Sequence, residues 1–301
     1  MAQRKTTVID PSTQQAIFDN LIKYAIAPRP ICFASTIDEA GDVNLSPFSY
    51  FNLMSQQPPI CVFSPLLRMR DGSTKHTLDN IHEIPEVVIN IVNYAMVQQQ
   101  SLASTEYGKG INEFDKSGFT PIASELIRPP RVAESPVQLE CKVHDIITLG
   151  DGPGSGNLII AEIVRMHIHE DLLNDQHQID QDALDLVARL GGNWYSRVTK
   201  ESLFEVPKPL RNLGIGVDAL PEHIRFSDIL TGNQLGRLAN VEQMPILTDE
   251  AILMENPKIL AIWEETKEDP ALRRKQLQTH AATLLDQGEL IVAWQVLLLE
   301  I

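Results

Sequence analysis

Cysteine is scarce in this chain, and the three that occur are far apart. Cys32, Cys61 and Cys141 lie in apolar or strand-like stretches, and no C-x-x-C pair is present. Disulfide frameworks and zinc sites both depend on cysteines at short, recurring spacings, so the sequence argues against both. We expect three buried free thiols in a reducing compartment, namely the cytoplasm.

A hydrophobic run long enough to cross a membrane is also absent. The longest, residues 290–299, is interrupted by Gln295 and falls well short of the roughly 20 residues that a spanning helix needs. Residues 1–10 carry cations with no apolar segment behind them, so we expect no secretory signal. The formal net charge of −15 disfavours nucleic acid and membranes as partners, but is compatible with a local pocket for one phosphate.

The motifs of several common catalytic classes are missing. No G-x-S-x-G segment occurs, and the glycine-rich residues 150–156 lack the Gly-Lys-Ser/Thr ending of a phosphate loop. A β-like segment follows them, so we interpret them as a hairpin turn. His167 and His169 share one face of a predicted strand beside Glu170, but no third ligand can be identified. Surface or interface histidines are therefore the better interpretation, and we expect no metal site.

Short β-like segments separated by turn signals dominate residues 31–168. Regular strand–helix alternation is absent, so we predict a mainly β, α+β fold, a barrel or sandwich with helical insertions, rather than a doubly wound α/β sheet. A first helix is expected near Pro11, capped by Ser12, a second over residues 74–83, and helical structure within 94–121. The predicted strands are residues 31–37, 43–50, 60–64, 87–92, 137–149 and 157–168, with Pro47 requiring a bulge or a sheet edge.

Composition changes beyond residues 207–209, which read Pro-Lys-Pro. Residues 211–301 are rich in Leu, Ala, Glu and Gln, and one segment has apolar residues at helical spacing: Leu272, Leu277, Ala281, Leu284 and Leu285. Gly288 is expected to end that helix. We therefore predict a domain over residues 1–210 and a helical extension over 211–301. Residues 290–299 are apolar on nearly every side and should be buried, against the barrel or in a subunit interface.

Hydroxyls, an asparagine and several cations gather in residues 28–81. Neutralising a phosphate needs cations and N–H or O–H donors, which Lys75 and Thr77 at a predicted helix start provide, with Arg70 upstream. Ser35, Thr36 and Ser49 can serve a polyhydroxyl chain or the phosphate. Asn44 and the backbone around Ser46-Pro47 can bind the polar edge of a flat heterocycle.

A second candidate segment, residues 188–195, reads Ala-Arg-Leu-Gly-Gly-Asn-Trp-Tyr. The pair Gly191-Gly192 permits close approach of the backbone or positive φ, and Trp194 and Tyr195 can wall a flat ring. A helix that ends at a glycine cap is an equally good interpretation of these residues alone.

Several ordered motifs resemble the flavin reductase-like, FMN-binding split-barrel family over about residues 25–206. They are Arg29-Pro30-Ile31, Ser35-Thr36, Asn44-x-Ser-Pro-Phe-Ser-Tyr-Phe, Ser55-x-x-Pro58-Pro59, Lys75-x-Thr77-x-x-Asn80-Ile81, Val88-x-Asn90-Ile91-Val92, Asn112-Glu113-Phe114, Leu139-Glu140-Cys141 and Arg189-Leu190-Gly191-Gly192-x-x-Tyr195. Residues 211–301 lie outside the resemblance.

The resemblance implies a homodimer that binds FMN near the subunit interface and receives hydride from NADH or NADPH at flavin N5. No dedicated acid, base or nucleophile is then needed, because the cofactor carries the chemistry. Electrons would pass to free flavin, a partner monooxygenase or a small acceptor. The alternative is a non-catalytic FMN-binding carrier or sensor. The cofactor-binding residues expected are Arg29, Ser35, Thr36, Asn44, Ser46, Pro47, Ser49, Phe51, Arg70, Lys75, Thr77, Gly191 and Tyr195.

Overall fold

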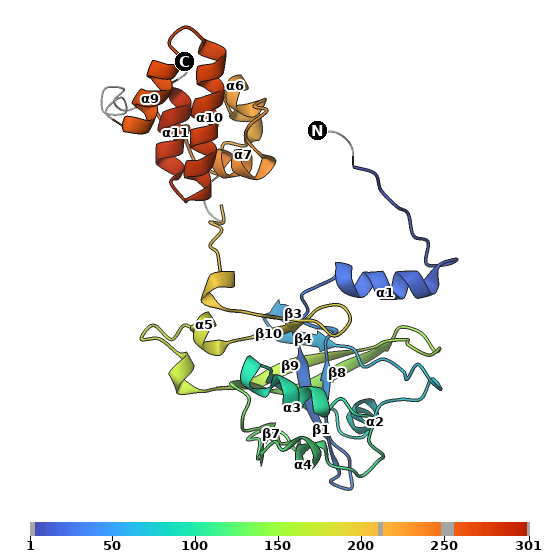
Figure 1. Cartoon of the computed structure of the whole chain (residues 1–301). Helices are drawn as coiled ribbons and strands as arrows, with labels where there is room; N and C mark the ends of the chain where they lie inside the picture. Colours follow the sequence, from blue (N-terminus) through green and yellow to red (C-terminus); the bar gives the residue numbers. More distant parts are fainter. Residues whose placement is uncertain (1–3, 210–212, 248–255, 300–301) are drawn as a thin grey trace. The chain divides into compact units, whose positions relative to one another are not determined.

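The computed structural model describes residues 4–209, 213–247 and 256–299, and it contains two compact units, Met1–Phe204 and Glu205–Ile301 (Figure 1). The domain boundary expected between residues 210 and 211 lies outside the described residues. No helix among the described residues is both long and apolar enough to span a bilayer.

The N-terminal unit combines a large antiparallel sheet with short helices. Its helices are α1 (Gln15–Ala25), α2 (His76–Glu83), α3 (Val97–Leu102), α4 (Glu113–Ser117) and α5 (Gln181–Leu184). Its strands are β1 (Cys32–Ile37), β2 (Val43–Phe48), β3 (Phe51–Gln56), β4 (Pro59–Phe63), β5 (Glu86–Ile91), β6 (Pro121–Ile122), β7 (Arg131–Val132), β8 (Val137–Thr148), β9 (Asn157–Ile168), β10 (Val187–Arg189) and β11 (Tyr195–Arg197). The predicted α+β class is confirmed.

Seven strands form the main sheet in the order β2-β1-β5-β8-β9-β4-β3, and every neighbouring pair is antiparallel. β2 lies at one edge, where Pro47 pairs opposite Phe33 without interrupting the register. The edge position expected for Pro47 is therefore confirmed, since a proline there withholds no hydrogen bond from a second neighbour. The glycine-rich residues 150–156 connect β8 to β9 as a hairpin turn, also as expected.

β1 is buried on both faces, which fixes the layers of the unit. Cys32 and Ala34 belong to a core that also contains Phe63 of β4 and Leu78 of α2. Phe33, on the opposite face, belongs to a second core with residues of α3, α4 and their flanks. Cys32, Cys61 and Cys141 are buried and free, as predicted.

One local expectation was wrong, and one strand was not predicted. The first helix begins at Gln15 and not near Pro11, because Ser12 donates its backbone N–H (2.8 Å) and hydroxyl (2.7 Å) to the Asp10 carboxylate and forms a turn instead of a cap. β3 was not anticipated, because its sequence has no β-branched residues and most of its side chains are exposed. Phe51 is its first residue.

The C-terminal unit is helical, as predicted. Its described helices are α6 (Glu222–Arg225), α7 (Gly232–Ala239), α9 (Pro257–Glu265), α10 (Pro270–Asp286) and α11 (Leu290–Leu298), of which α9, α10 and α11 lie side by side (Figure 1). Gly288, at φ +94°, follows the end of α10. The core is built around α11, whose Trp294 and Leu297 are fully buried with Leu285 of α10. This corrects the expected burial of residues 290–299 against the barrel or in a subunit interface: the segment packs inside its own unit.

Candidate functional site

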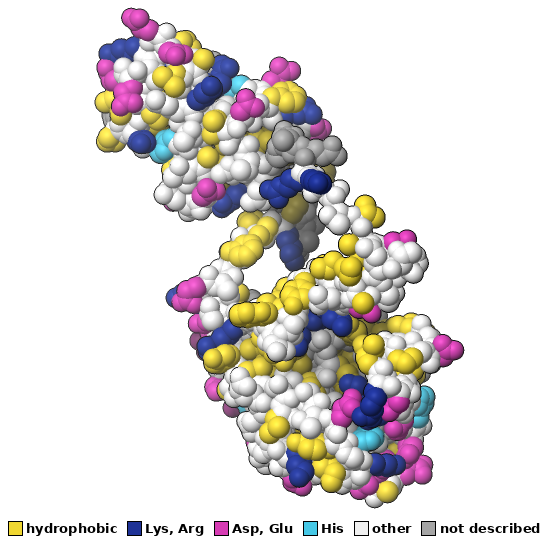
Figure 2. Space-filling view, turned by 45° about the vertical axis from the view of Figure 1, so that its right-hand side comes forward, with side chains coloured by type: hydrophobic (Ala, Val, Ile, Leu, Met, Phe, Trp, Pro, Cys, Tyr) yellow, Lys and Arg dark blue, Asp and Glu magenta, His cyan; other side chains and the backbone are white. Residues whose placement is uncertain are grey.

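Lys75 stands directly before α2 and lines two neighbouring depressions of the N-terminal unit. The first, the Lys75 cleft, has a volume of about 260 Å³ and is bordered by residues that include Arg29, Pro47, Ser49, Ser64, Lys75 and Arg189. The second, the Arg68 hollow, has about 30 Å³ and is bordered by residues that include Asn44, Ser46, Arg68, Lys75, Thr77 and Glu113. Figure 2 shows a hollow on this unit with Lys and Arg side chains inside it and hydrophobic side chains along its rim.

The Lys75 ammonium is half-buried and lacks a close counterion. Its Nζ lies 5.4 Å from the centre of the Phe48 ring, and no carboxylate among the described residues is within ion-pair distance. Burial lowers the pKa of Lys75, and the Glu106 carboxylate only partly offsets this. A partly dehydrated cation without a counterion binds an incoming anion more strongly than a fully hydrated cation does.

Arg70, expected beside Lys75, is directed elsewhere. Its side chain is 73% exposed and pairs with Asp71 at 3.1 Å and Glu106 at 3.9 Å. Arg68 lines the hollow instead. Its side chain is only 14% exposed, donates to the Ser73 hydroxyl at 3.2 Å and lies 3.8 Å from the same Glu106 carboxylate. The structure therefore brings Arg68, and not Arg70, next to Lys75.

Ser35 and Thr36 do not reach the surface of either depression. Both are fully buried on β1, and Thr36 accepts a hydrogen bond from the Asn80 amide at 3.2 Å. Asn44 and Thr77 border the Arg68 hollow but bond to each other, from the amide Nδ2 to the hydroxyl at 2.8 Å. Because neither Ser35 nor Thr36 borders the cleft or the hollow, the structure does not place their hydroxyls against a ligand there, contrary to the expectation.

Arg29 lines the Lys75 cleft, but its guanidinium is already engaged. It donates to the carbonyl oxygens of Lys23 (2.7 Å), Ile26 (2.6 Å) and Leu190 (3.0 Å), and more weakly to the Ser49 hydroxyl at 3.4 Å. Two of these carbonyls lie at the end of α1, which leaves unpaired C=O groups there. Arg29 therefore shapes the cleft by fastening α1 and residue 190 together.

Residues 188–195 form a β-hairpin, so the alternative of a helix end is wrong. Arg189 of β10 pairs with Tyr195 of β11, and Gly192 has φ +56°. A Cβ on Gly191 would lie 2.3 Å from the Tyr24 ring, which explains the glycine by close packing against α1. Gly192 borders the Lys75 cleft, whereas Tyr195 borders a different cleft on the other side of Arg189.

The model of the flavin reductase like domain matches residues 24–183, which is more than half of the chain. The chain belongs to the flavin reductase-like family. This membership identifies it as a flavin-related reductase with a flavin as its cofactor.

The chain is also similar to individual proteins and solved structures. An uncharacterised protein of Halalkalibacterium halodurans is 36% identical over 175 residues, which cover 58% of this chain and 83% of that protein. Nitrilotriacetate monooxygenase component B from Bacillus cereus has a TM-score of 0.63 and 29% identity, covering 68% of this chain and all of that one. Pseudomonas fluorescens 2-nitrobenzoate 2-nitroreductase NbaA has a TM-score of 0.60 and 28% identity, covering 69% of this chain and all of that one.

The split-barrel architecture is confirmed by a further structure. A putative flavin reductase with a split barrel domain from Shewanella frigidimarina has a TM-score of 0.55 and 25% identity, and covers 66% of this chain and 94% of its own. In this flavin reductase-like chain the seven-stranded antiparallel sheet lies within the N-terminal unit.

One observation independent of the family indicates that the Lys75 cleft can take a polar ligand, as a flavin is. The Ser64 hydroxyl borders the cleft, is buried and has no hydrogen-bond partner. Leaving such a group unpaired is costly, so a polar ligand in the cleft would satisfy it. Sequence reasoning missed Ser64, although its place directly after β4 put it beside the residues already singled out.

Glu113 is a second missed residue, quoted above only as part of a motif. Its side chain is buried at the Arg68 hollow and accepts the Leu45 N–H at 3.0 Å. Burial raises the pKa of Glu113. It thus joins α4 to the edge strand β2 at the point where Lys75 and Arg68 meet.

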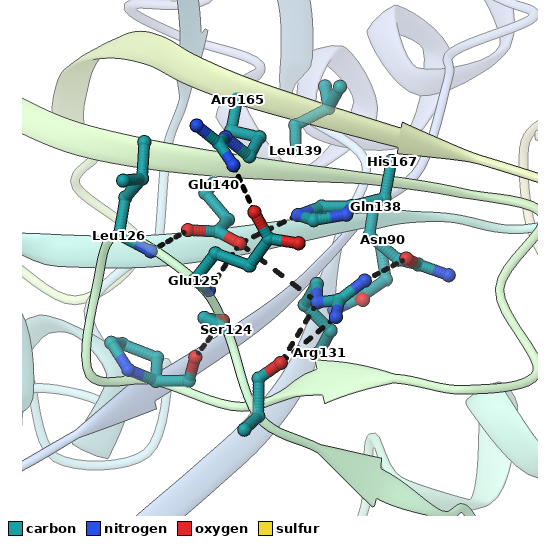
Figure 3. Close-up of polar contacts among 12 residues, drawn as sticks. Asn90, Ser124, Glu125, Leu126, Arg131, Gln138, Leu139, Glu140, Arg165 and His167 are labelled. Atoms are coloured by element: carbon teal, nitrogen blue, oxygen red, sulfur yellow. Dashed lines mark hydrogen bonds and ion pairs between the residues drawn. The ribbon is translucent and has the colours of Figure 1, made fainter.

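The two histidines considered as metal ligands have different surroundings. His169 follows the end of β9, whereas His167 Nε2 lies 2.7 Å from the buried Glu140 carboxylate (Figure 3). That carboxylate also accepts the backbone N–H groups of Glu125 (2.8 Å) and Leu126 (2.7 Å). Within the described parts of the chain no cluster of three or more His, Cys, Asp or Glu residues could hold a metal. The Glu140 network anchors the loop before β7 to β8 and β9.

Proposed function

We propose that this flavin reductase-like protein is an FMN-dependent oxidoreductase that takes hydride from NADH or NADPH. The observation that carries the proposal is the half-buried, unpaired Lys75 ammonium at the start of α2, on the wall of the cleft. A phosphate at this position would gain a charge-assisted contact and the favourable end of the helix dipole.

FMN is preferred over FAD because Lys75, of the cations that border the Lys75 cleft, stands at a helix start, where the helix dipole adds to the attraction of one phosphate. The Ser49 and Ser64 hydroxyls are suited to the ribityl chain, and the backbone at Pro47 to the ring edge. Gly192 permits close approach from the hairpin. When bound, FMN supplies the hydride-accepting chemistry, and the chain holds its phosphate and orients its ring.

The ionisable groups that border the Lys75 cleft among the described residues suit this division of labour. They are the cations Lys23, Arg29, Lys75 and Arg189, together with the Tyr50 phenol, and no carboxylate is among them. Cations hold anions and stabilise a reduced, negatively charged flavin, whereas a general base would call for a carboxylate or histidine. These cations thus support a protein that binds and orients the flavin, while the flavin itself carries the chemistry.

The electron acceptor proposed is free flavin, a partner monooxygenase or a small molecule. A role as the reductase of a two-component system is suggested by the structural neighbour described as a monooxygenase component B. Three buried free thiols suit a reducing compartment, and we place the reaction in the cytoplasm.

We further propose a homodimer. The edge strand β3 exposes Leu53 (54%) and Met54 (58%), and α1 exposes Ile17, Leu21 and Tyr24. Apolar side chains exposed on an edge strand and on a helix are typical of interfaces. Light scattering on the purified protein should give twice the chain mass of 33.6 kDa, and a mass equal to one chain would contradict the dimer.

An anaerobic titration tests the catalytic proposal. The protein, loaded with FMN, should lose its flavin absorbance on addition of NADH or NADPH and regain it when an acceptor is added. A holoprotein that neither nucleotide reduces would favour the alternative, a non-catalytic carrier or sensor. Binding of FAD in preference to FMN would overturn the cofactor assignment while leaving the flavin chemistry intact.

A further inference from the structure

A second cleft of about 320 Å³, here named the hairpin cleft, lies between α3 and the β10–β11 hairpin. It shares Arg189 with the Lys75 cleft and none of the other residues that border it. Ligand pockets in proteins are typically about 300–1,000 Å³, so this volume is sufficient for a small ring compound.

The hairpin cleft combines apolar surface with aromatic walls. Val97 of α3 and Val187 of β10 are buried and supply the apolar part. Two guanidinium groups lie over tyrosine rings. The Arg189 guanidinium is 4.7 Å from the centre of the Tyr195 ring, and the Arg197 guanidinium lies over the Tyr94 ring. These cation–π contacts place both guanidinium groups against the aromatic walls of the cleft.

The two arginines differ in their remaining charge. Arg197 is neutralised by Asp185, which accepts two hydrogen bonds from it at 2.6 and 2.8 Å. Arg189 donates from Nη1 to the Trp194 carbonyl oxygen at 3.1 Å and forms no ion pair with any described residue. Since a guanidinium carries five N–H donors, Arg189 keeps donors and a full positive charge for a ligand.

We propose that the hairpin cleft binds a small planar aromatic carboxylate. The carboxylate accepts a pair of hydrogen bonds from Arg189, the geometry that a guanidinium matches best. The ring lies against Val97 and Val187, and the Ser101 hydroxyl and Asn193 amide are within the same lining for polar ring substituents. Through Arg189 the bound carboxylate is next to the Lys75 cleft, which matters for electron transfer only if the proposed flavin function holds.

Benzoate is the probe, and benzamide is its neutral counterpart of the same shape. Calorimetric titration of the full-length protein should show benzoate binding at least about tenfold more tightly than benzamide, as expected of a charge-assisted contact. In Arg189→Gln the advantage of benzoate should disappear. Equal binding of the two probes by the unchanged protein would overturn the proposal.

A pair of further variants separates the two clefts, because Arg189 borders both. Ser101→Trp, on the exposed side of α3, fills the hairpin cleft without reaching the Lys75 cleft. Its neighbour Leu102, 47% exposed and outside the lining, provides the matched control Leu102→Trp. We expect Ser101→Trp to abolish benzoate binding and Leu102→Trp to preserve it. Undiminished benzoate binding by Ser101→Trp would refute the site.

FMN titration of the same four proteins keeps this proposal distinct from the proposed function. Ser101→Trp should bind FMN as the unchanged protein does. Benzoate binding by a protein that fails to bind FMN would sustain the hairpin cleft and refute the flavin assignment. FMN binding without any benzoate binding would sustain the flavin assignment and refute the hairpin cleft.

Discussion

Lys75 can be tested at the scale of one residue, because FMN and riboflavin differ only in the phosphate. If its ammonium contacts that phosphate, Lys75→Ala removes a charge-assisted contact worth roughly 1.5–3 kcal/mol. The affinity for FMN should then fall by about 10- to 100-fold, while that for riboflavin barely changes. Flavin fluorescence quenching measures both dissociation constants.

Arg70→Ala is the matched control, since Arg70 also lies near the start of α2 but its exposed charge is directed to Asp71 and Glu106. Exposed ion pairs contribute little, and we expect FMN affinity within about threefold of the unchanged protein. An equal loss for FMN and riboflavin in Lys75→Ala would indicate a folding defect. No loss for either would refute the phosphate assignment.

At the scale of elements, Gly191 fixes how α1 meets the hairpin. Because an added Cβ would lie 2.3 Å from the Tyr24 ring, Gly191→Ala should destabilise the N-terminal unit by about 1–3 kcal/mol. Gly152→Ala is the control, as that glycine has open space around it. Urea denaturation gives the free energies of unfolding. In a Tyr24→Ala background the effect of Gly191→Ala should shrink, and an unchanged effect would contradict the contact.

Glu140 gives a pH-dependent prediction for the loop that it anchors. Burial alone would raise the pKa of Glu140, but hydrogen bonds from Glu125, Leu126 and His167 outweigh it and the pKa is lowered. A carboxyl with a depressed pKa in the folded state stabilises the fold at neutral pH, and this contribution is lost as the pH falls below about 4.3. Glu140→Gln should therefore unfold more easily at pH 7 and differ less from the unchanged protein near pH 3.

The control for that series is Glu125→Gln, which removes an exposed ion pair with Arg165. It should change the free energy of unfolding by no more than about 1 kcal/mol. A Glu140→Gln variant as stable as Glu125→Gln at pH 7 would show that the buried network contributes nothing measurable.

Elements with strong local signals could be predicted from the sequence, and those that depend on partners could not. The β-branched run in β5 and the glycine turn between β8 and β9 are readable without tertiary information. β3 is not, because its pairing with β4 stabilises an exposed strand that has little intrinsic preference for one. Among site residues, Lys75 could be predicted from its place at a helix start. Arg68 and Ser64 could not, because the folding of the loop after β4 brings them to the two depressions.

At the scale of the whole molecule, the two units have separate hydrophobic cores. α11 places Trp294 and Leu297 at the centre of the C-terminal core, and none of that core comes from the described residues before Glu205. We propose on this ground that the two units are independent domains, and that flavin binding needs only the first.

Two truncations test this independence. A chain ending at Phe204 should fold and bind FMN with the affinity of the full chain, because Lys75, Ser64 and the hairpin all belong to the N-terminal unit. Deleting residues 290–301 instead removes α11 from its core, and losing even one large buried side chain costs about 3–5 kcal/mol. The C-terminal unit should then unfold, seen as lost helical circular dichroism and reduced solubility, with FMN binding retained. If the chain ending at Phe204 folds but no longer binds FMN, the C-terminal unit contributes to the flavin site and the independence of the two units is refuted.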